Sequence, residues 1–154
     1  MNLVSLADAV FDRLNGDSTL LGLVTGGIRH WYNKSDQPEN SQTPYGVITV
    51  DIGAHEHSTR GEIWDLDVTV TIHVPRTTTL QTAEDAVTRI HGDATTRADL
   101  TPSIGLHRWT PSLSGSWTAG VMVCVDGSTF SDNVDWFTTS LVYRCRLSRE
   151  APTS

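Results

Sequence analysis

The chain has 154 residues and a mass of 16.9 kDa, enough for one domain with a hydrophobic core and too little for two ordinary ones. Its formal net charge is -7 and its 11 basic residues are scattered, which excludes the basic patch of a nucleic-acid reader. No run of about 18 apolar residues and no charged-then-apolar leader is present, so we expect a soluble, unexported protein that is not bound to a membrane. We expect a single domain over residues 1–148 and a flexible tail over residues 149–154.

The N-terminal part of the chain predicts two helical segments, a short strand and a polar arm. Residues 2–15 place apolar side chains at steps of three and four, the spacing of a helix packed on a core. We expect Ser18 or Thr19 to cap a second, short helical turn, and residues 28–32 to form a strand. Residues 33–44 hold two prolines and no apolar side chain, so they predict a loop or arm that orders only against something else.

Two strands follow, and the second is the clearest element in the chain. Residues 45–52 predict a strand, and residues 62–74 alternate between apolar and polar side chains. A period of two over this length indicates one buried face and one solvated face, as in an antiparallel sheet. The predicted buried positions are Trp64, Leu66, Val68, Val70, Ile72 and Val74, and the predicted solvated positions are Asp65, Asp67, Thr69, Thr71 and His73.

The C-terminal half predicts one more helix and a final strand pair. Residues 80–98 carry a helical apolar face, residues 103–109 predict a strand, and residues 120–125 and 136–147 predict a hairpin. Helices and strands in this order predict an α+β fold: an antiparallel sheet of mixed strand order with two main helices on one face and long polar loops. The apolar helix positions are Leu80, Ala83, Val87, Ile90 and Ala94, and those of the last strand are Phe137, Leu141, Tyr143, Cys145 and Leu147.

The two cysteines are too few for a disulfide scaffold and lack the paired spacing of a zinc site. In a hairpin centred near Phe130, Cys124 lies opposite a residue near Phe137, and Cys145 opposite one near Ser116. We therefore expect two separate, reduced thiols that pack as small hydrophobic side chains.

Residues 53–62, with the sequence GAHEHSTRGE, allow two interpretations. On an extended strand His55 and His57 point to the same side, and with Glu62 they could bind a cation. The H-x-H spacing resembles the first motif of cupins, a metal-binding barrel family, but Thr49 stands where a glycine is expected, and the spacing around His107 does not fit the second motif. The other interpretation, a polar connection between antiparallel strands with solvated or interfacial histidines, explains more of the segment.

No catalytic set emerges from the other motifs. The segment TGGIRH lacks the lysine and helix of a phosphate-binding loop, and SLSGS lacks the strand-to-helix context of a nucleophile elbow. Asp65 and Asp67 share a strand face and could be paired carboxylates, but a solvated face is the ordinary interpretation. We therefore expect a protein that is not an enzyme and that binds no cofactor.

The tryptophans are candidates for binding. Trp64 belongs to the buried face of its strand, whereas the other four lie near predicted strand ends or beside loops: Trp31, Trp109, Trp117 and Trp136. Tryptophan is enriched where protein surfaces meet. It also covers the ends of sheets, and the sequence leaves both roles open.

The order of segments resembles the tail-completion or tail-terminator proteins of long-tailed bacteriophages. The resemblance rests on LADAVFDRL, LLGLVTGGIRHWY, TPYGVITV after a polar loop, EIWDLDVTVTIHV and TAEDAVTRIHGDA, within about the first hundred residues. It is a resemblance of pattern, without an invariant motif, and the final segment around DGSTFSDNVD departs from it.

The resemblance implies a virion protein of the tail and neck region, assembled in the host cytoplasm. Such subunits form a ring, usually a hexamer, that ends the tail tube and joins the tail tube protein to a head–tail connector or stopper protein, with the tape-measure protein a further possible partner. DNA would pass through the lumen without specific binding, and six copies at -7 each would discourage it from sticking. The interface candidates are Trp31, Tyr32, Lys34, Asp36, Glu39, His55, His57, Arg60, Asp65 and Asp67. A connector or head-closure subunit and a cupin-like metal enzyme are the alternatives.

Overall fold

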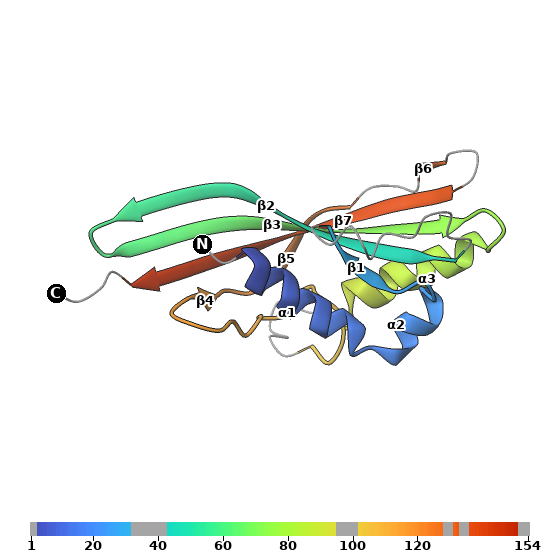
Figure 1. Cartoon of the computed structure of the whole chain (residues 1–154), viewed down its shortest axis with the longest axis horizontal. Helices are drawn as coiled ribbons and strands as arrows, with labels where there is room; N and C mark the ends of the chain where they lie inside the picture. The colour runs from blue at the N-terminus through green and yellow to red at the C-terminus, as the bar shows by residue number, and fades with distance from the viewer. Residues whose placement is uncertain (1–2, 32–42, 95–101, 128–130, 133–135, 151–154) are drawn as a thin grey trace.

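The computed structural model describes residues 3–31, 43–94, 102–127, 131–132 and 136–150. Within these residues, three helices and seven strands form one α+β arrangement, with the helices gathered on one side of a long, twisted sheet (Figure 1). In chain order these elements are α1 Leu3–Asn15, α2 Ser18–Leu23, β1 Ile28–His30, β2 Tyr45–Ser58, β3 Gly61–Pro75, α3 Leu80–His91, β4 Thr118–Ala119, β5 Val123–Gly127, β6 Ser131–Asp132 and β7 Trp136–Glu150.

The sheet is built on three long strands, with β3 between β2 and β7. The strand order is β1-β2-β3-β7-β4, and β5 and β6 also pair with β7. All pairs are antiparallel except β1 with β2, which is parallel. The predicted α+β class with helices on one face is therefore confirmed. We call the sheet face toward the helices the inner face and the opposite one the outer face.

The core lies between the inner face and the helices, where the predicted periodicities place it. Alternate side chains of β3 from Leu66 to Val74 are buried, as are four side chains of the α1 stripe and four apolar side chains of β7. The α1 and β7 sets are Leu6, Ala7, Val10 and Leu14, and Leu141, Tyr143, Cys145 and Leu147. In α3 the buried positions are Ala83, Ala86 and Ile90, whereas Leu80 is 40% exposed because it opens the helix at its solvated end.

The cap of α2 is Asp17, and the prediction of Ser18 or Thr19 was wrong. One carboxylate oxygen of Asp17 accepts the backbone N–H groups of Thr19 and Leu20, while the other accepts the side chain of Arg89 on α3. Burial opposes ionisation of this carboxylate, but Arg89 and the two N–H donors outweigh it and lower the pKa of Asp17. One side chain therefore both starts α2 and ties it to α3.

The third helix ends at His91, earlier than the predicted end near residue 98. Gly92 has a φ of +104° and its N–H donates to the carbonyl of Thr88, so the chain leaves the helix there. Residues 95–98 of the predicted helix lie outside the described residues. Gly92 packs directly on Ile104 and Gly105, and a side chain at either glycine would meet backbone atoms.

The segment over residues 103–109 is not the predicted strand. Gly105 and Arg108 have positive φ values of 80° and 69°, which an extended strand does not allow. The N–H groups of Leu106 and His107 instead donate to the last carbonyls of α3, those of Ile90 and His91. This irregular segment carries Leu106, which is fully buried, beneath the sheet.

A histidine pair lies where this segment meets β7. The rings of His91 and His107 stack with 4.5 Å between centroids, and His91 Nδ1 lies 3.5 Å from the hydroxyl of Tyr143. His107 Nδ1 accepts the backbone N–H of Cys124 on β5. Burial lowers the pKa of both histidines, so the fold favours their neutral forms.

The two cysteines are free thiols, as predicted, but their neighbours differ from the prediction. Cys124 lies opposite Tyr143, not a residue near Phe137, because pairs such as Gly127 with Leu141 centre the hairpin several residues after Phe130. Cys145 faces the core opposite Leu66 of β3, not a residue near Ser116. Burial raises the pKa of the Cys145 thiol to about 12, which keeps it protonated and unreactive at neutral pH.

Candidate functional site

The prominent surface feature is an arm formed by the distal parts of the three long strands. We define the hairpin arm as residues 51–65 together with residues 146–150 of β7. It extends beyond the helices to one end of the molecule (Figure 1), and every residue from 51 to 60 is exposed. Because β2 runs to Ser58 and β3 begins at Gly61, only Thr59 and Arg60 form the turn, and the prediction of a polar connection over residues 53–62 was too long.

A hydrogen bond at one end of the turn and a glycine at the other stabilise it. The hydroxyl of Ser58 accepts the backbone N–H of Arg60 at 3.2 Å. Gly61 has a φ of +145°, a conformation that residues with a side chain rarely adopt. Ser58 and Gly61 are directly paired across the strands, so the turn fixes the register of the whole arm.

The arm carries an open strand edge. On the side away from β3, β2 pairs with β1 only at Gly46, Val47 and Ile48. Within the described residues, the part of β2 from residue 49 to 58 therefore has β3 as its only strand neighbour. An unpaired edge of this length offers backbone donors and acceptors to another strand.

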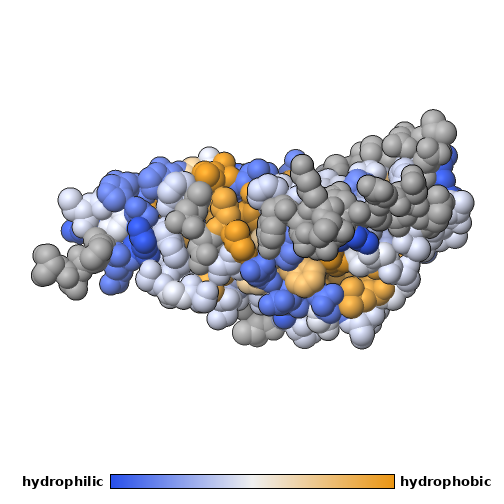
Figure 2. Space-filling model, viewed as in Figure 1, coloured by the Kyte–Doolittle hydropathy of each residue, from blue (hydrophilic) through white to orange (hydrophobic). Residues whose placement is uncertain are grey.

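Ile52 adds an apolar contact to this edge. It is 50% exposed although its partner across the strands, Leu66, is fully buried. Figure 2 shows apolar side chains gathered on the visible face over the middle of the molecule, whereas the end that holds the turn is hydrophilic. The open edge of β2 and the exposed apolar side chain of Ile52 together suit a contact with another protein chain.

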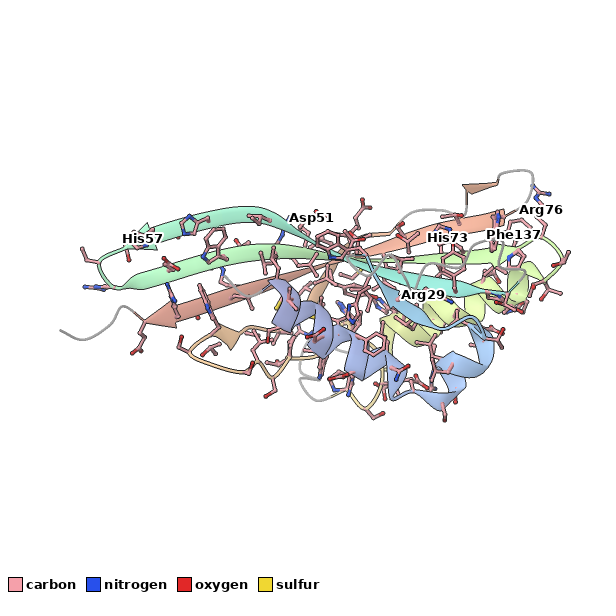
Figure 3. The ribbon with its side chains drawn as sticks, viewed as in Figure 1. Arg29, Asp51, His57, His73, Arg76 and Phe137 are labelled. Atoms are coloured by element: carbon pink, nitrogen blue, oxygen red, sulfur yellow. The ribbon has the colours of Figure 1, made fainter. Side chains whose placement is uncertain are left out.

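The structure brings His55, His57 and Glu62 together near the end of the arm. His55 and His57 share the inner-face side of β2, as the alternation predicted, and Glu62 lies directly opposite His57. One ligand atom from each lies within 4.8 Å of the others. His57 lies at the free end of the arm, far from His73 and Phe137 at the other end of the sheet (Figure 3).

The surroundings of the cluster hold two of its members in place. The ring of His55 stacks on Trp64 with 3.7 Å between centroids. Glu62 accepts Arg149 at 3.2 Å, and Arg149 in turn lies 4.8 Å over the ring of Trp117. Burial disfavours the charged form of Glu62, but Arg149, Trp64 and the two imidazoles outweigh it and lower the pKa of Glu62.

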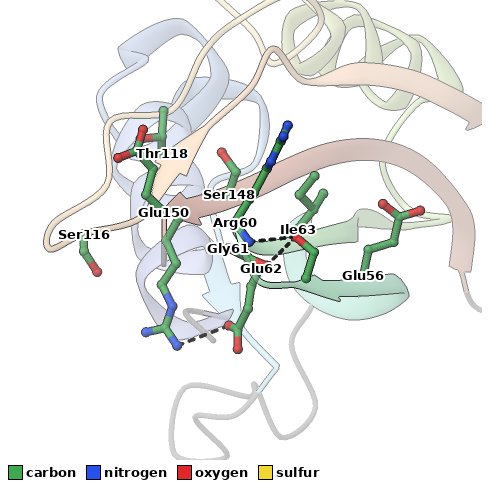
Figure 4. Close-up of a pocket in the computed structure, with 11 residues that line it drawn as sticks. Glu56, Arg60, Gly61, Glu62, Ile63, Ser116, Thr118, Ser148 and Glu150 are labelled. Carbon is green, nitrogen blue, oxygen red and sulfur yellow. Dashed lines mark hydrogen bonds and ion pairs between the residues drawn. The ribbon is translucent and has the colours of Figure 1, made fainter. Parts of the chain in front are cut away.

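A polar hollow of about 620 Å³ lies beside the turn. Figure 4 shows it with the Glu62–Arg149 ion pair on one wall. Its lining is mainly charged or hydroxylated, and includes Glu56, Ser58, Arg60, Glu62, Ser116, Thr118, Ser148, Arg149 and Glu150. The hollow is open rather than enclosed, which suits a protein contact better than a small-molecule site that buries most of its ligand.

Asp65 and Asp67 lie on the outer face, as the alternation predicted, but each is paired. Arg146 donates to Asp65 at 2.8 and 3.0 Å, and Arg144 donates to Asp67 at 3.0 and 3.4 Å. The Arg146 hydrogen bond, opposed by partial burial, lowers the pKa of Asp65. These are cross-strand ion pairs rather than the paired carboxylates of an acid–base site.

The sequence analysis missed these arginine partners. An Asp-x-Asp run on one strand and an Arg-x-Arg run on another are complementary, and the β3–β7 register aligns them as Asp65 with Arg146 and Asp67 with Arg144. The matching spacing was the available signal, and it becomes informative only when the strand pairing is known.

The tryptophans divide between the two roles that the sequence left open. Trp31 is 46% exposed directly after β1, consistent with a contact surface. The rings of Trp109 and Trp117 lie under the guanidinium groups of Arg13 and Arg149 and pack against the core. The ring of Trp136 meets Tyr45 edge-on at one end of the sheet.

The remaining interface candidates are only partly placed. Arg60 lies in the exposed turn of the arm. Tyr32, Lys34, Asp36 and Glu39 lie outside the described residues. None of the helices that the structure describes is long and apolar enough to cross a lipid bilayer.

Comparison with known proteins adds a likeness of fold. No known protein family and no curated protein matches the sequence. Among solved structures, the chain is similar to a protein chain of the "Virion of native gene transfer agent (GTA) particle", with a TM-score of 0.66 and 18% sequence identity. The likeness covers 94% of this chain and 95% of the other, so the two share their fold over nearly their whole lengths.

Proposed function

We propose that the protein is a structural subunit of a phage-like virion, and specifically a tail terminator that forms a ring at the head-proximal end of the tail tube. The observation that carries the proposal is the likeness of the whole fold, over 94% of the chain, to a protein of a gene transfer agent virion. The order of segments in the sequence, which resembles tail-completion proteins, supports the same assignment. In this proposal the protein is not an enzyme, needs no cofactor for its function and resides in the neck region of the tail.

The hairpin arm supports ring formation. A strand edge over residues 49–58 without a second strand partner, exposed from residue 51 onward, and the half-exposed Ile52 are features that a soluble monomer normally protects. In a closed ring each arm can add to the sheet or helices of the next copy, so that every subunit both gives and receives one contact. The ring is proposed to be a hexamer.

The mechanism is geometric. One face of the ring packs on the last layer of tail tube protein, and the other face differs from a tube layer, so no further tube protein adds. That second face receives the connector or stopper protein, and the tape-measure protein reaches the inner rim. DNA passes through the lumen without specific contacts.

A head–tail connector or head-closure subunit is the second candidate, because the shared fold does not separate neighbouring neck proteins. The two differ in their first partner. A terminator binds preformed tail tubes in the absence of heads, whereas a connector subunit binds head particles in the absence of tubes. Sedimentation of the purified protein with each particle separates the two candidates.

The cupin-like enzyme has no support in the fold. Cupins are closed barrels of many short strands, whereas this protein has an open sheet with three long strands and helices on one face. The histidines that suggested it lie on an exposed arm rather than inside a barrel.

The proposed interface is tested by placing a charge on the arm. Ile52→Lys is expected to weaken ring assembly by at least about tenfold, because a buried contact would then carry an unpaired charge. Leu80→Lys is the control, since Leu80 is also exposed, at 40%, but lies at the start of α3. Native mass spectrometry over a concentration series measures both. Equal assembly of the two variants would contradict an interface at Ile52.

A further inference from the structure

The end of the hairpin arm holds a set of side chains of the types that bind metal ions. His55 and His57 supply imidazole nitrogens from one strand, and Glu62 supplies a carboxylate oxygen from the next. In many zinc sites two imidazoles and one carboxylate are the three protein ligands, and a water molecule is the fourth ligand. No helix or loop of the described residues covers His55 or His57, so a hydrated cation can reach them.

Two neighbouring contacts pre-orient these ligands. Arg149 holds Oε2 of Glu62 at 3.2 Å, which leaves Oε1 facing His57 Nδ1 at 3.3 Å. Trp64 holds the ring of His55 by stacking. Supporting contacts of this kind restrict the orientation of ligands before any metal binds.

We propose that His55, His57 and Glu62 form a binding site for a divalent transition-metal ion, with zinc as the reference ion. Nitrogen-rich ligand sets favour zinc and its neighbours over calcium and magnesium, which prefer oxygen alone. In the bound form the cation lies between His57 and Glu62, and it links β2 to β3 one pair before the Ser58–Gly61 pair at the turn.

The geometry fits this ion after small side-chain rotations. Zinc bonds of about 2.0–2.1 Å place tetrahedral ligand atoms roughly 3.3–3.4 Å apart. The separation of His57 Nδ1 and Glu62 Oε1 is already 3.3 Å, and the largest separation within the set is 4.8 Å. His55 closes the remaining distance by a small movement along the face of Trp64, and its exposed position on the arm gives it room.

The test is a titration of the untagged, full-length protein with zinc chloride in competition with a chromophoric chelator. The expected result is one zinc ion per chain. His55→Ala, His57→Ala and Glu62→Gln should each weaken binding by more than about tenfold, the size of effect that even supporting residues show in metal sites. Because all three residues lie at the arm's end, far-UV circular dichroism should show each variant folded.

Glu56→Gln is the matched control. Glu56 lies between the two histidines in sequence, but it pairs with Ile63 on the other side of the strand. The Glu56→Gln substitution therefore removes one negative charge, as Glu62→Gln does, without removing a metal ligand. Its affinity should stay within about twofold of the parent, since exposed charges are screened at moderate salt. Parent-like binding by the His55 and His57 variants, or no binding by the parent, would overturn the proposal and leave a plain ion pair at the turn.

The metal site can be tested independently of the proposed function, because chelator competition measures metal binding in any oligomeric state. A protein that forms rings but binds no zinc contradicts the metal site alone. A protein that binds zinc at these residues but neither forms rings nor binds tubes contradicts the terminator alone.

Discussion

Each of the two aspartates on the outer face of β3 is held by an arginine of β7. Asp65 and Asp67 therefore do not add free negative charge to this face, as a DNA-repelling lumen would need. Asp51, directly opposite Asp67 on β2, and Glu56, opposite Ile63, also lie on this face. If this face lines the lumen, Arg144 and Arg146 offset two of its carboxylates, and Asp51 and Glu56 keep it acidic.

Removing the carboxylates of Asp65 and Asp67 should make this face less acidic and free two arginines for contact with DNA. Asp65→Asn with Asp67→Asn leaves Arg144 and Arg146 unpaired, so binding of double-stranded DNA at low salt should rise severalfold and vanish as salt increases. Fluorescence anisotropy of a labelled duplex measures the change. The control adds Arg144→Gln and Arg146→Gln, which restores balance. An equal rise in the control would show that the arginines are not responsible.

Gly92 and Gly105, which pack directly on each other, should be among the positions that tolerate substitution least. Gly105 has a φ of +80°, and an added Cβ would collide with Gly92, so Gly105→Ala should lower the free energy of unfolding by about 2–4 kcal/mol. Gly115 has a similar φ of +86° with open space around it, and Gly115→Ala should cost only about 1–2 kcal/mol. Urea unfolding compares the two, and equal losses would contradict the close contact.

At the scale of elements, the arm is separable from the core. Residues 51–60 are exposed on both faces of β2, whereas the same strand is buried at Ile48 and Val50 beside the helices. Residues 51–60 therefore contribute little to the core, although Leu147 on the β7 side of the arm belongs to it. The length and open edge of this part of the arm call for another explanation. Assembly with neighbouring copies is the one that we propose.

Shortening the arm should abolish assembly without unfolding the protein. Deleting residues 56–57 and 62–63 removes two cross-strand pairs and preserves the alternation of faces. We expect a melting temperature close to the parent's and loss of rings by size-exclusion chromatography with light scattering. The control keeps the arm length and replaces Thr59 and Arg60 with Asn-Gly, which suits a two-residue turn. Normal rings from the shortened protein would remove the arm from the interface.

Elements whose apolar side chains recur at a regular spacing could be predicted from the sequence, and elements without such a spacing could not. The stripes of α1, β3 and β7 are one-sided, so alternation and helical spacing located them and their buried faces. The distal half of β2 has no buried face and hence no period, and the segment was taken for a long turn. The strand predicted at residues 103–109 failed because positive φ at Gly105 and Arg108 depends on packing against α3. The parallel pairing of β1 has no local signal at all.

At the scale of the whole molecule, partly buried histidines should make the fold sensitive to acid. Burial lowers the folded-state pKa of His73, His91 and His107. Since the unfolded value is about 6.5, the unfolded chain binds more protons below that pH, so stability is full above it and falls as the pH decreases toward the lowered values.

This predicts a lower urea midpoint at pH 5.5 than at pH 7.5. The double variant His91→Gln, His107→Gln should show a smaller difference between the two pH values, because it removes two of the three groups. An unchanged pH dependence in the variant would mean that other groups govern acid stability. Salt should change this dependence only slightly, since burial rather than surface charge causes the shifts.

The central claim, that this fold ends a tail tube, is tested most directly by the length of tubes polymerised with and without the protein. The cognate tail tube protein is assembled in vitro, the protein is added at increasing ratios, and tube lengths and ends are recorded by electron microscopy. The account predicts tubes that shorten as the ratio rises and that carry one ring at a single end. Tubes of unchanged length with bare ends would contradict it.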